Sequence, residues 1–178
     1  MKILSLVLMM GFGMAPPSAQ AQPPAANGYT ASVRVRWDAI KKNIAGSAMA
    51  MPDAGFAFKP TPDVRSFGEL IGHLANEHYI FCSQIKGEKN PHEAVDFEKK
   101  TTKAELVKDI NDSIAYCDAA YAAVKDDAKA TAPFAANRRG TPFSSMLGNL
   151  THDSEHYGNL VTYLRLKGIV PPSSQPSR

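Results

Sequence analysis

Apolar residues recur at steps of three and four along four stretches of the chain, which is the spacing of one buried helix face. In the first stretch these residues are Val33, Trp37, Ile40, Ile44 and Ala48. The helix ends follow from capping residues, prolines and glycines. The predicted ranges are Tyr29 to Met51, Ser66 or Asp63 to about Lys86, Thr101 or Thr102 to about Asp126, and Thr141 to Gly168. No strand pattern competes, so the sequence predicts an all-α fold, an antiparallel or mixed four-helix bundle.

The first 21 residues have the order of a secretory signal peptide. Lys2 is followed by an apolar stretch from Ile3 to Ala15, and Ala19-Gln20-Ala21 has the small-x-small pattern of a cleavage site. The apolar stretch is too short to span a bilayer. We therefore expect export to the periplasm or the medium, where thiols oxidise, with no stable membrane insertion after cleavage. Residues 22–28 are expected to form a flexible lead, 29–172 the bundle domain and 173–178 a disordered tail.

Composition narrows the function classes. The chain has 178 residues, of which 44% are hydrophobic, which suits one globular domain. Its 20 Lys and Arg residues exceed its 17 Asp and Glu residues by only three, and they form no long basic run. A dedicated nucleic-acid-binding protein is therefore not expected. Two cysteines cannot form a disulfide scaffold, although they can form one bridge.

Three histidines are candidate metal ligands. His152 and His156 are four residues apart on the fourth predicted helix, so they project from one face about one turn apart. Such a pair can bind one divalent metal ion through neutral imidazoles, and His73 on the second predicted helix can supply a third ligand. The alternative is a hydrogen-bonded or surface pair on a polar helix face, because spacing alone does not show that the two helix faces meet.

Glu77 is the candidate catalytic residue. It follows His73 by one helical turn and lies on the same face. It could serve as a fourth ligand, as a general base or as a partner for the free N–H group of a ligand. The alternative is a solvated helix carboxylate.

The remaining polar residues near these positions have less specific patterns. His78 falls on the apolar side of its helix and is expected to be structural, and His92 is expected to be solvated in a loop. Asp153 and Glu155 flank the histidine face and are expected at the surface. Asn149 and Tyr163 are candidates for the lining of a pocket. Arg138 and Arg139, just before the fourth helix, are candidates for an anion site, although they could equally lie in a solvated loop.

Two segments resemble the DinB-like family of metalloproteins. Ser66-Phe67-Gly68-Glu69-Leu70-Ile71-Gly72-His73-Leu74-Ala75 is similar to its second helix, and His152-Asp153-Ser154-Glu155-His156-Tyr157-Gly158-Asn159-Leu160 to its His-x-x-x-His helix. The resemblance implies an up-down-down-up bundle, a divalent metal (nickel or zinc) on His73, His152 and His156, and a homodimer. Many members continue with Arg-Gly-Gln, where this chain has Tyr157-Gly158-Asn159, so a role for that arginine does not transfer.

The family is functionally mixed, so the resemblance implies the fold more directly than the reaction. The leading expectation is a metal-dependent hydrolase or transferase that acts on a small molecule. The alternatives are a non-catalytic bundle that binds a metal or small ligand, and a structural bundle whose apolar face, with Phe143, Leu150 and Val161, recruits a partner.

The two cysteines are a test of topology. Cys82 lies near the end of the second predicted helix and Cys117 past the middle of the third. In antiparallel helices their heights would differ by roughly 15 Å, which is too far for a bond. In parallel helices, the arrangement that the family resemblance implies, the heights nearly match. We therefore predict a Cys82–Cys117 disulfide; the alternative is two small buried residues.

Overall fold

Four long helices form the protein in a computed structural model that describes residues 28–135 and 139–176. The long helices are α1 (Tyr29–Ala50), α2 (Phe67–Lys86), α3 (Lys103–Ala123) and α5 (Pro142–Leu166), and the short elements are α4 (Asp127–Thr131), η1 (Asp53–Gly55), η2 (Phe97–Lys99) and η3 (Pro172–Ser174). The described ranges contain no strand. The predicted all-α class is therefore confirmed.

The predicted signal peptide at 1–21 lies outside the described residues, as does all of the predicted lead except Gly28. Within the described ranges, none of the helices combines the length and the apolar character that crossing a bilayer requires.

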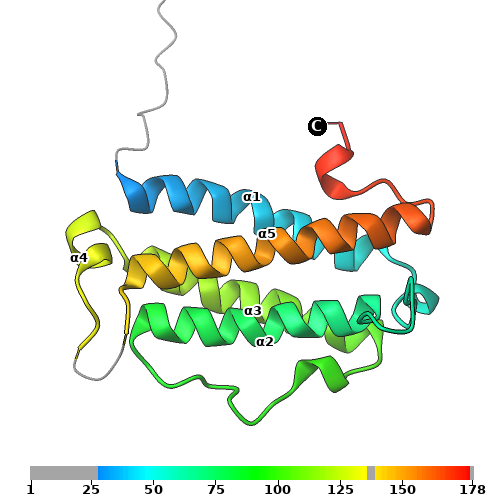
Figure 1. The fold of residues 1–178 in the computed structure, drawn as a ribbon, viewed down its shortest axis with the longest axis horizontal. Coiled ribbons are helices and arrows are strands. Elements are labelled where there is room, and N and C mark those ends of the chain that lie inside the picture. The colour runs from blue at the N-terminus through cyan, green and yellow to red at the C-terminus, as the bar shows by residue number, and fades with distance from the viewer. Residues whose placement is uncertain (1–27, 136–138, 177–178) are drawn as a thin grey trace, which may run out of the picture.

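The direction of the helices matches the predicted up-down-down-up order. In Figure 1, α1 and α5 run from left to right, whereas α2 and α3 both run from right to left. The segment between α2 and α3 makes this possible, because it travels back along the length of the bundle before α3 begins. Parallel neighbours need such a long return, whereas antiparallel neighbours can be joined by a short loop.

Side-chain caps decide where the helices begin. The Ser66 hydroxyl accepts a hydrogen bond from the backbone N–H of Glu69, whose carboxylate accepts one from the Ser66 N–H, so Ser66 rather than Asp63 caps α2. Thr102 caps α3 and Thr141 caps α5 in the same manner, through their hydroxyl groups. These contacts satisfy N–H groups that have no partner within the helix.

The chain departs from the predicted elements at two places. The helix expected to reach Asp126 ends at Ala123, and Asp126 instead caps the short α4 by accepting a hydrogen bond from the Lys129 N–H at 2.7 Å. Part of the expected disordered tail is ordered in η3, where the Tyr157 hydroxyl lies 2.7 Å from the Ser173 hydroxyl. This contact attaches the described end of the chain to α5.

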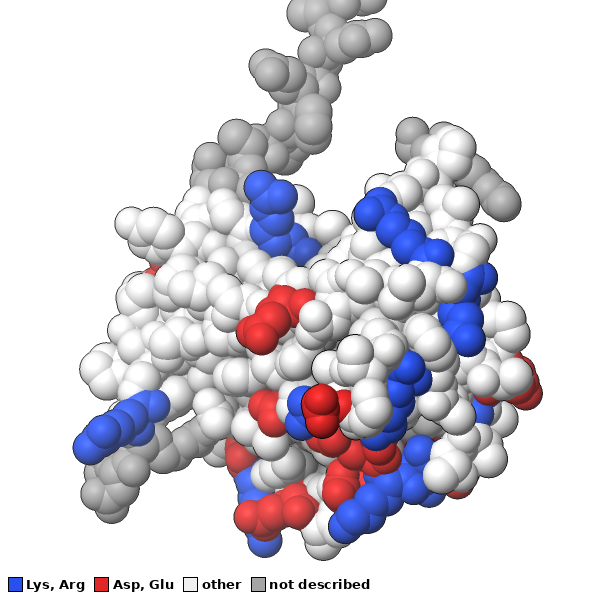
Figure 2. Space-filling model, turned by 45° about the vertical axis from the view of Figure 1, so that its right-hand side comes forward, with Lys and Arg blue, Asp and Glu red and all other residues white. Residues whose placement is uncertain are grey.

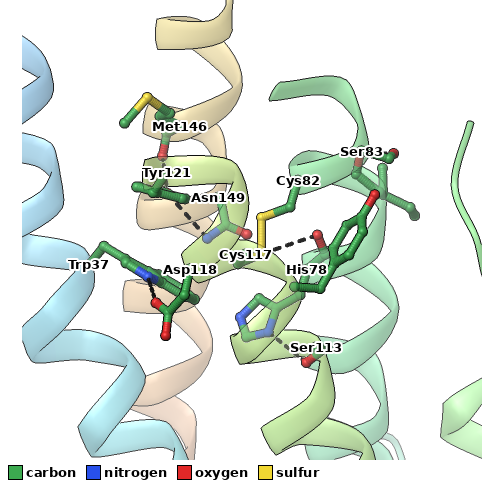
Figure 3. The surroundings of a disulfide bond; sticks show 12 residues. Trp37, His78, Cys82, Ser83, Ser113, Cys117, Asp118, Tyr121, Met146 and Asn149 are labelled. Carbon is green, nitrogen blue, oxygen red and sulfur yellow. Dashed lines mark hydrogen bonds between the residues drawn. A yellow bond between two sulfur atoms is a disulfide. The ribbon is translucent and has the colours of Figure 1, made fainter. Parts of the chain in front are cut away.

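The predicted disulfide is present in the core. Cys82 of α2 and Cys117 of α3 are bonded, with 5.2 Å between their Cα atoms, and both residues are fully buried (Figure 3). The pair lies beside the aromatic centre of the bundle, in which Trp37 stacks on Tyr121 with 5.0 Å between the rings. Because the two cysteines match in height only on parallel helices, the bond and the helix order agree.

A buried polar cluster joins α2, α3 and α5. His78 contacts the Ser113 hydroxyl at 2.9 Å (Figure 3) and an Asp153 carboxylate oxygen at 3.1 Å. The second Asp153 oxygen accepts a hydrogen bond from the Asn149 amide at 3.0 Å. The expected structural role of His78 fits its complete burial. The expected surface position of Asp153 is wrong, because this residue is also fully buried and its carboxylate is held by core partners.

Replacing Asp153 by Ala should lower the free energy of unfolding by about 3 kcal/mol, because it removes the partner of the buried His78 Nε2 and one of the two acceptors of the Asn149 amide. Urea unfolding at neutral pH would measure the loss. The matched control is Glu155→Ala on the exposed side of α5, which should change stability by less than about 0.5 kcal/mol. Equal effects of the two substitutions would contradict the inferred role of the buried cluster.

Candidate metal centre

Helices α2 and α5 bring the three candidate ligands into one cluster. One ring nitrogen from each of His73, His152 and His156 lies within 4.8 Å of the others. The Nε2 atoms of His73 and His152 are 3.1 Å apart. The rings of His152 and His156, one turn apart on α5, have centroids 4.4 Å apart. The histidine-bearing faces of α2 and α5 therefore meet, which the spacing of the residues alone did not show.

The cluster has the properties of a transition-metal site. Two nitrogen ligands on one tetrahedral ion lie about 3.3 Å apart, close to the separation of the His73 and His152 Nε2 atoms. Nδ1 of His152 is buried and has no hydrogen-bond partner among the described residues. Three imidazoles, with no carboxylate between them, suit zinc or nickel better than magnesium or calcium.

The protein environment keeps two of these imidazoles, those of His152 and His156, neutral. Burial lowers the pKa of His152 from 6.5 to about 3, with smaller contributions from His156 and His73. Burial also lowers the pKa of His156, with His73 as the next cause. A neutral imidazole keeps the nitrogen lone pair that a metal ion needs, whereas a protonated ring cannot bind one.

Glu98 orients His73 from outside the cluster. One Glu98 carboxylate oxygen lies 2.7 Å from Nδ1 of His73, and the other accepts a hydrogen bond from Nε of Arg65 at 2.9 Å. A carboxylate on one imidazole nitrogen fixes the ring orientation and leaves the other nitrogen for the metal. His73 is therefore held in place from α2 by its backbone and from η2 by Glu98.

Sequence reasoning missed Glu98, which is 25 residues from His73 and lies outside the long helices. The structural reason for its position is Gly72, where a Cβ atom would overlap the backbone of Phe97 and Glu98. The absence of a side chain at residue 72 allows η2 to lie directly on α2. The glycine before His73 was the available signal, although nothing in the sequence connected it to Glu98.

A cavity of about 270 Å³ opens beside His73. Its wall includes Glu77, the candidate catalytic residue, which has no hydrogen bond with the three histidines. His92 lies in the same wall with its ring 4.3 Å from that of Tyr79. The expectation of a solvated His92 is therefore wrong, because this ring is half-buried against an aromatic neighbour.

A second cavity, of about 610 Å³, opens beside His156. Its wall includes Tyr163, one of the two pocket candidates, and Asn159, whose amide lies 3.3 Å from Nδ1 of His156. Asn149, the other candidate, is instead fully buried in the core.

The structure describes only one residue of the arginine pair before α5. Arg139 is exposed and lines neither of the two cavities, and Arg138 lies outside the described residues.

The fold and site define an all-helical protein with a three-histidine cluster between two helices, and comparison with known proteins identifies its family. The DinB superfamily matches residues 36–160, so the chain belongs to that superfamily. A DinB-like protein from Bacillus cereus ATCC 10987 is 15% identical, with a TM-score of 0.65 over 79% of this chain and 93% of its own. A conserved protein from Enterococcus faecalis is 17% identical, with a TM-score of 0.60 over 79% and 98%. Comparison with curated proteins finds no match.

The metal-free protein should lose stability as pH falls below about 6.5. His152 has a lower pKa in the folded protein than the ordinary value of 6.5, so the unfolded chain binds protons more readily between pH 6.5 and about 3. Urea unfolding of metal-free protein across this range would measure the slope. His152→Asn should flatten it, whereas Ser154→Ala, on the exposed face of α5, should leave it unchanged. An unchanged slope in His152→Asn would contradict the prediction.

Proposed function

We propose that this DinB superfamily protein is an exported metalloenzyme. It binds one divalent transition-metal ion, nickel or zinc, through His73, His152 and His156. Its reaction is a metal-dependent hydrolysis or group transfer on a small molecule. The observation that carries the proposal is the partly buried cluster of three imidazoles, with Glu98 hydrogen-bonded to His73.

The chain's own residues prepare the ligand set. When bound, such a metal supplies a Lewis acid that can activate water or a thiol near neutral pH. His73 donates its Nδ1 hydrogen to Glu98, which makes Nε2 the ligand atom and increases its basicity. Burial keeps His152 and His156 unprotonated. Three neutral ligands leave the charge of the ion uncompensated and leave a coordination position for substrate.

Glu77 is the proposed general base. It shares the wall of the 270 Å³ cavity with His73, and among the described residues it forms no ion pair or hydrogen bond. A carboxylate that is not occupied by protein partners is available to accept a proton from water or substrate in that cavity. Its role in the proposal is to receive this proton, whereas Glu98 only orients His73.

Other parts of the proposal concern location and partners. The signal-peptide pattern and the Cys82–Cys117 bond both favour an oxidising compartment outside the cytoplasm. The proposal includes a homodimer and no nucleic-acid partner. On the face in Figure 2, Lys and Arg side chains are separated or mixed with acidic ones and form no continuous basic patch, which supports the second point.

Metal content tests the proposal directly. Protein without a His tag, loaded with zinc or nickel and then desalted, should retain close to one equivalent by elemental analysis. The His73/His152/His156→Ala variant should retain none. Glu98→Gln should weaken metal binding by about 10–100-fold through loss of the carboxylate on His73. Glu93→Gln, in the same connection but directed to Lys89, should have no effect. Retention of less than a tenth of an equivalent by folded wild-type protein would contradict the proposal.

Glu77→Gln tests the catalytic part separately. With 4-nitrophenyl acetate as the probe, the zinc-loaded variant should hydrolyse the ester about 100-fold more slowly than wild-type protein and retain the same zinc content. The expected difference arises because glutamine cannot accept the proton. Equal rates would contradict the role of Glu77. Full zinc binding without turnover of this or any other activated ester would favour the alternative of a non-catalytic metal-binding bundle.

A further inference from the structure

The cavity beside His156 has the dimensions and composition of a small-molecule site. Its volume of about 610 Å³ is within the range of 300–1,000 Å³ that is usual for ligand pockets. One wall is formed by the connection before α2, with Val64 and Arg65, and the opposite wall by Tyr163 of α5. His156 connects this space to the three-histidine cluster. A ligand in the cavity would therefore lie next to the proposed metal.

Arg65 is held in this cavity from two directions. The Tyr163 hydroxyl donates a hydrogen bond to the Arg65 carbonyl oxygen at 2.6 Å, which fixes the backbone against α5. Glu98 accepts from Nε of Arg65 at 2.9 Å and lies 3.5 Å from Nη2, which fixes the side chain. Nη1 has no partner among the described residues, so part of the guanidinium group is still available.

The charges around the cavity limit a ligand to a single negative charge. Arg65 supplies the positive group in the wall of the cavity. Glu98 already compensates part of that charge, and Asp63 lies in the same wall. The two carboxylates would repel a dianion more strongly than a monoanion.

The remaining wall is suited to an apolar group. Val64, which is 40% exposed, lines the cavity together with Leu70 and Tyr163. Apolar surface near one fixed guanidinium group matches a molecule with a hydrocarbon body and one charged end.

We propose that this cavity binds a small carboxylate, with its anionic end on Arg65 and its apolar body against Val64 and Tyr163. The planar guanidinium group matches the geometry of a carboxylate. The inference rests on the proposed function, because it assigns the substrate subsite of that metal centre. It adds the substrate class, a monoanionic carboxylic acid, and makes Arg65 the residue that recognises it.

Hexanoate and its neutral isostere hexanamide are suitable probes. Calorimetric titration of the metal-free protein measures their binding to this cavity without a contribution from the metal. Hexanoate should bind at least tenfold more tightly than hexanamide. Arg65→Gln should weaken hexanoate binding at least tenfold and leave hexanamide unchanged, whereas Asp63→Asn should tighten hexanoate binding severalfold by removing a repulsive charge. Arg36→Gln, an exposed arginine of α1, is the control for a general loss of positive charge.

Circular dichroism establishes that each variant is folded, and Arg65→Lys, which retains the charge, should restore part of the affinity. Equal binding of hexanoate and hexanamide, or unchanged hexanoate binding in Arg65→Gln, would overturn the inference. Hexanoate binding that requires zinc and is lost in the triple histidine variant would also overturn it, while supporting the metal centre. Failure of the metal centre would instead appear in the elemental analysis.

Discussion

The close approach of the α2–α3 connection to α2 is the constraint on which the rest of the structure depends. The connection returns along the bundle, so α2 and α3 run parallel, and it crosses α2 where only Gly72 leaves room for its backbone. Parallel helices bring Cys82 and Cys117 to the same height, where they are bonded. The same segment carries Glu98 to His73. The path of this connection therefore accounts for the helix order, for the disulfide and for the contact that supports the candidate metal ligand His73.

A second constraint comes from the polar groups in the core. Asp153 is fully buried and must keep its contacts with His78 and Asn149, because an unpaired carboxylate in the interior is costly. Rotation of α5 by one residue, about 100°, would remove Asp153 from these partners. Asp153 directly follows His152, so the interaction that fixes the rotation of α5 also fixes the direction of His152. The core and the metal centre are thus coupled through adjacent residues of one helix.

The two cavities beside the cluster differ in charge. The one beside His73 is lined by several acidic residues, including Glu77 and Asp96, whereas the one beside His156 is lined by both Arg65 and Asp63. The two sides of the histidine cluster have different roles in the proposals. Glu77 is the proposed proton acceptor on one side, and Arg65 is the proposed anion-binding residue on the other.

The sequence by itself determined the four long helices and the spacing of His152 and His156, because helical periodicity and capping are local properties. It allowed the pairing of the two cysteines only together with the parallel helix order that the family resemblance implies, and the structure contains that bond. Thr102 and Thr141 cap the helices as their positions predict. Only the tertiary structure decided that Asp153 is buried, that Glu98 rather than Glu77 contacts His73, and that Arg65 lies beside His156. These three results depend on the rotation of one helix against another and on the path of irregular connections. Helix rotation and loop path are set by packing between segments that are distant in the sequence. Such packing leaves no repeating pattern of residues from which it could be predicted.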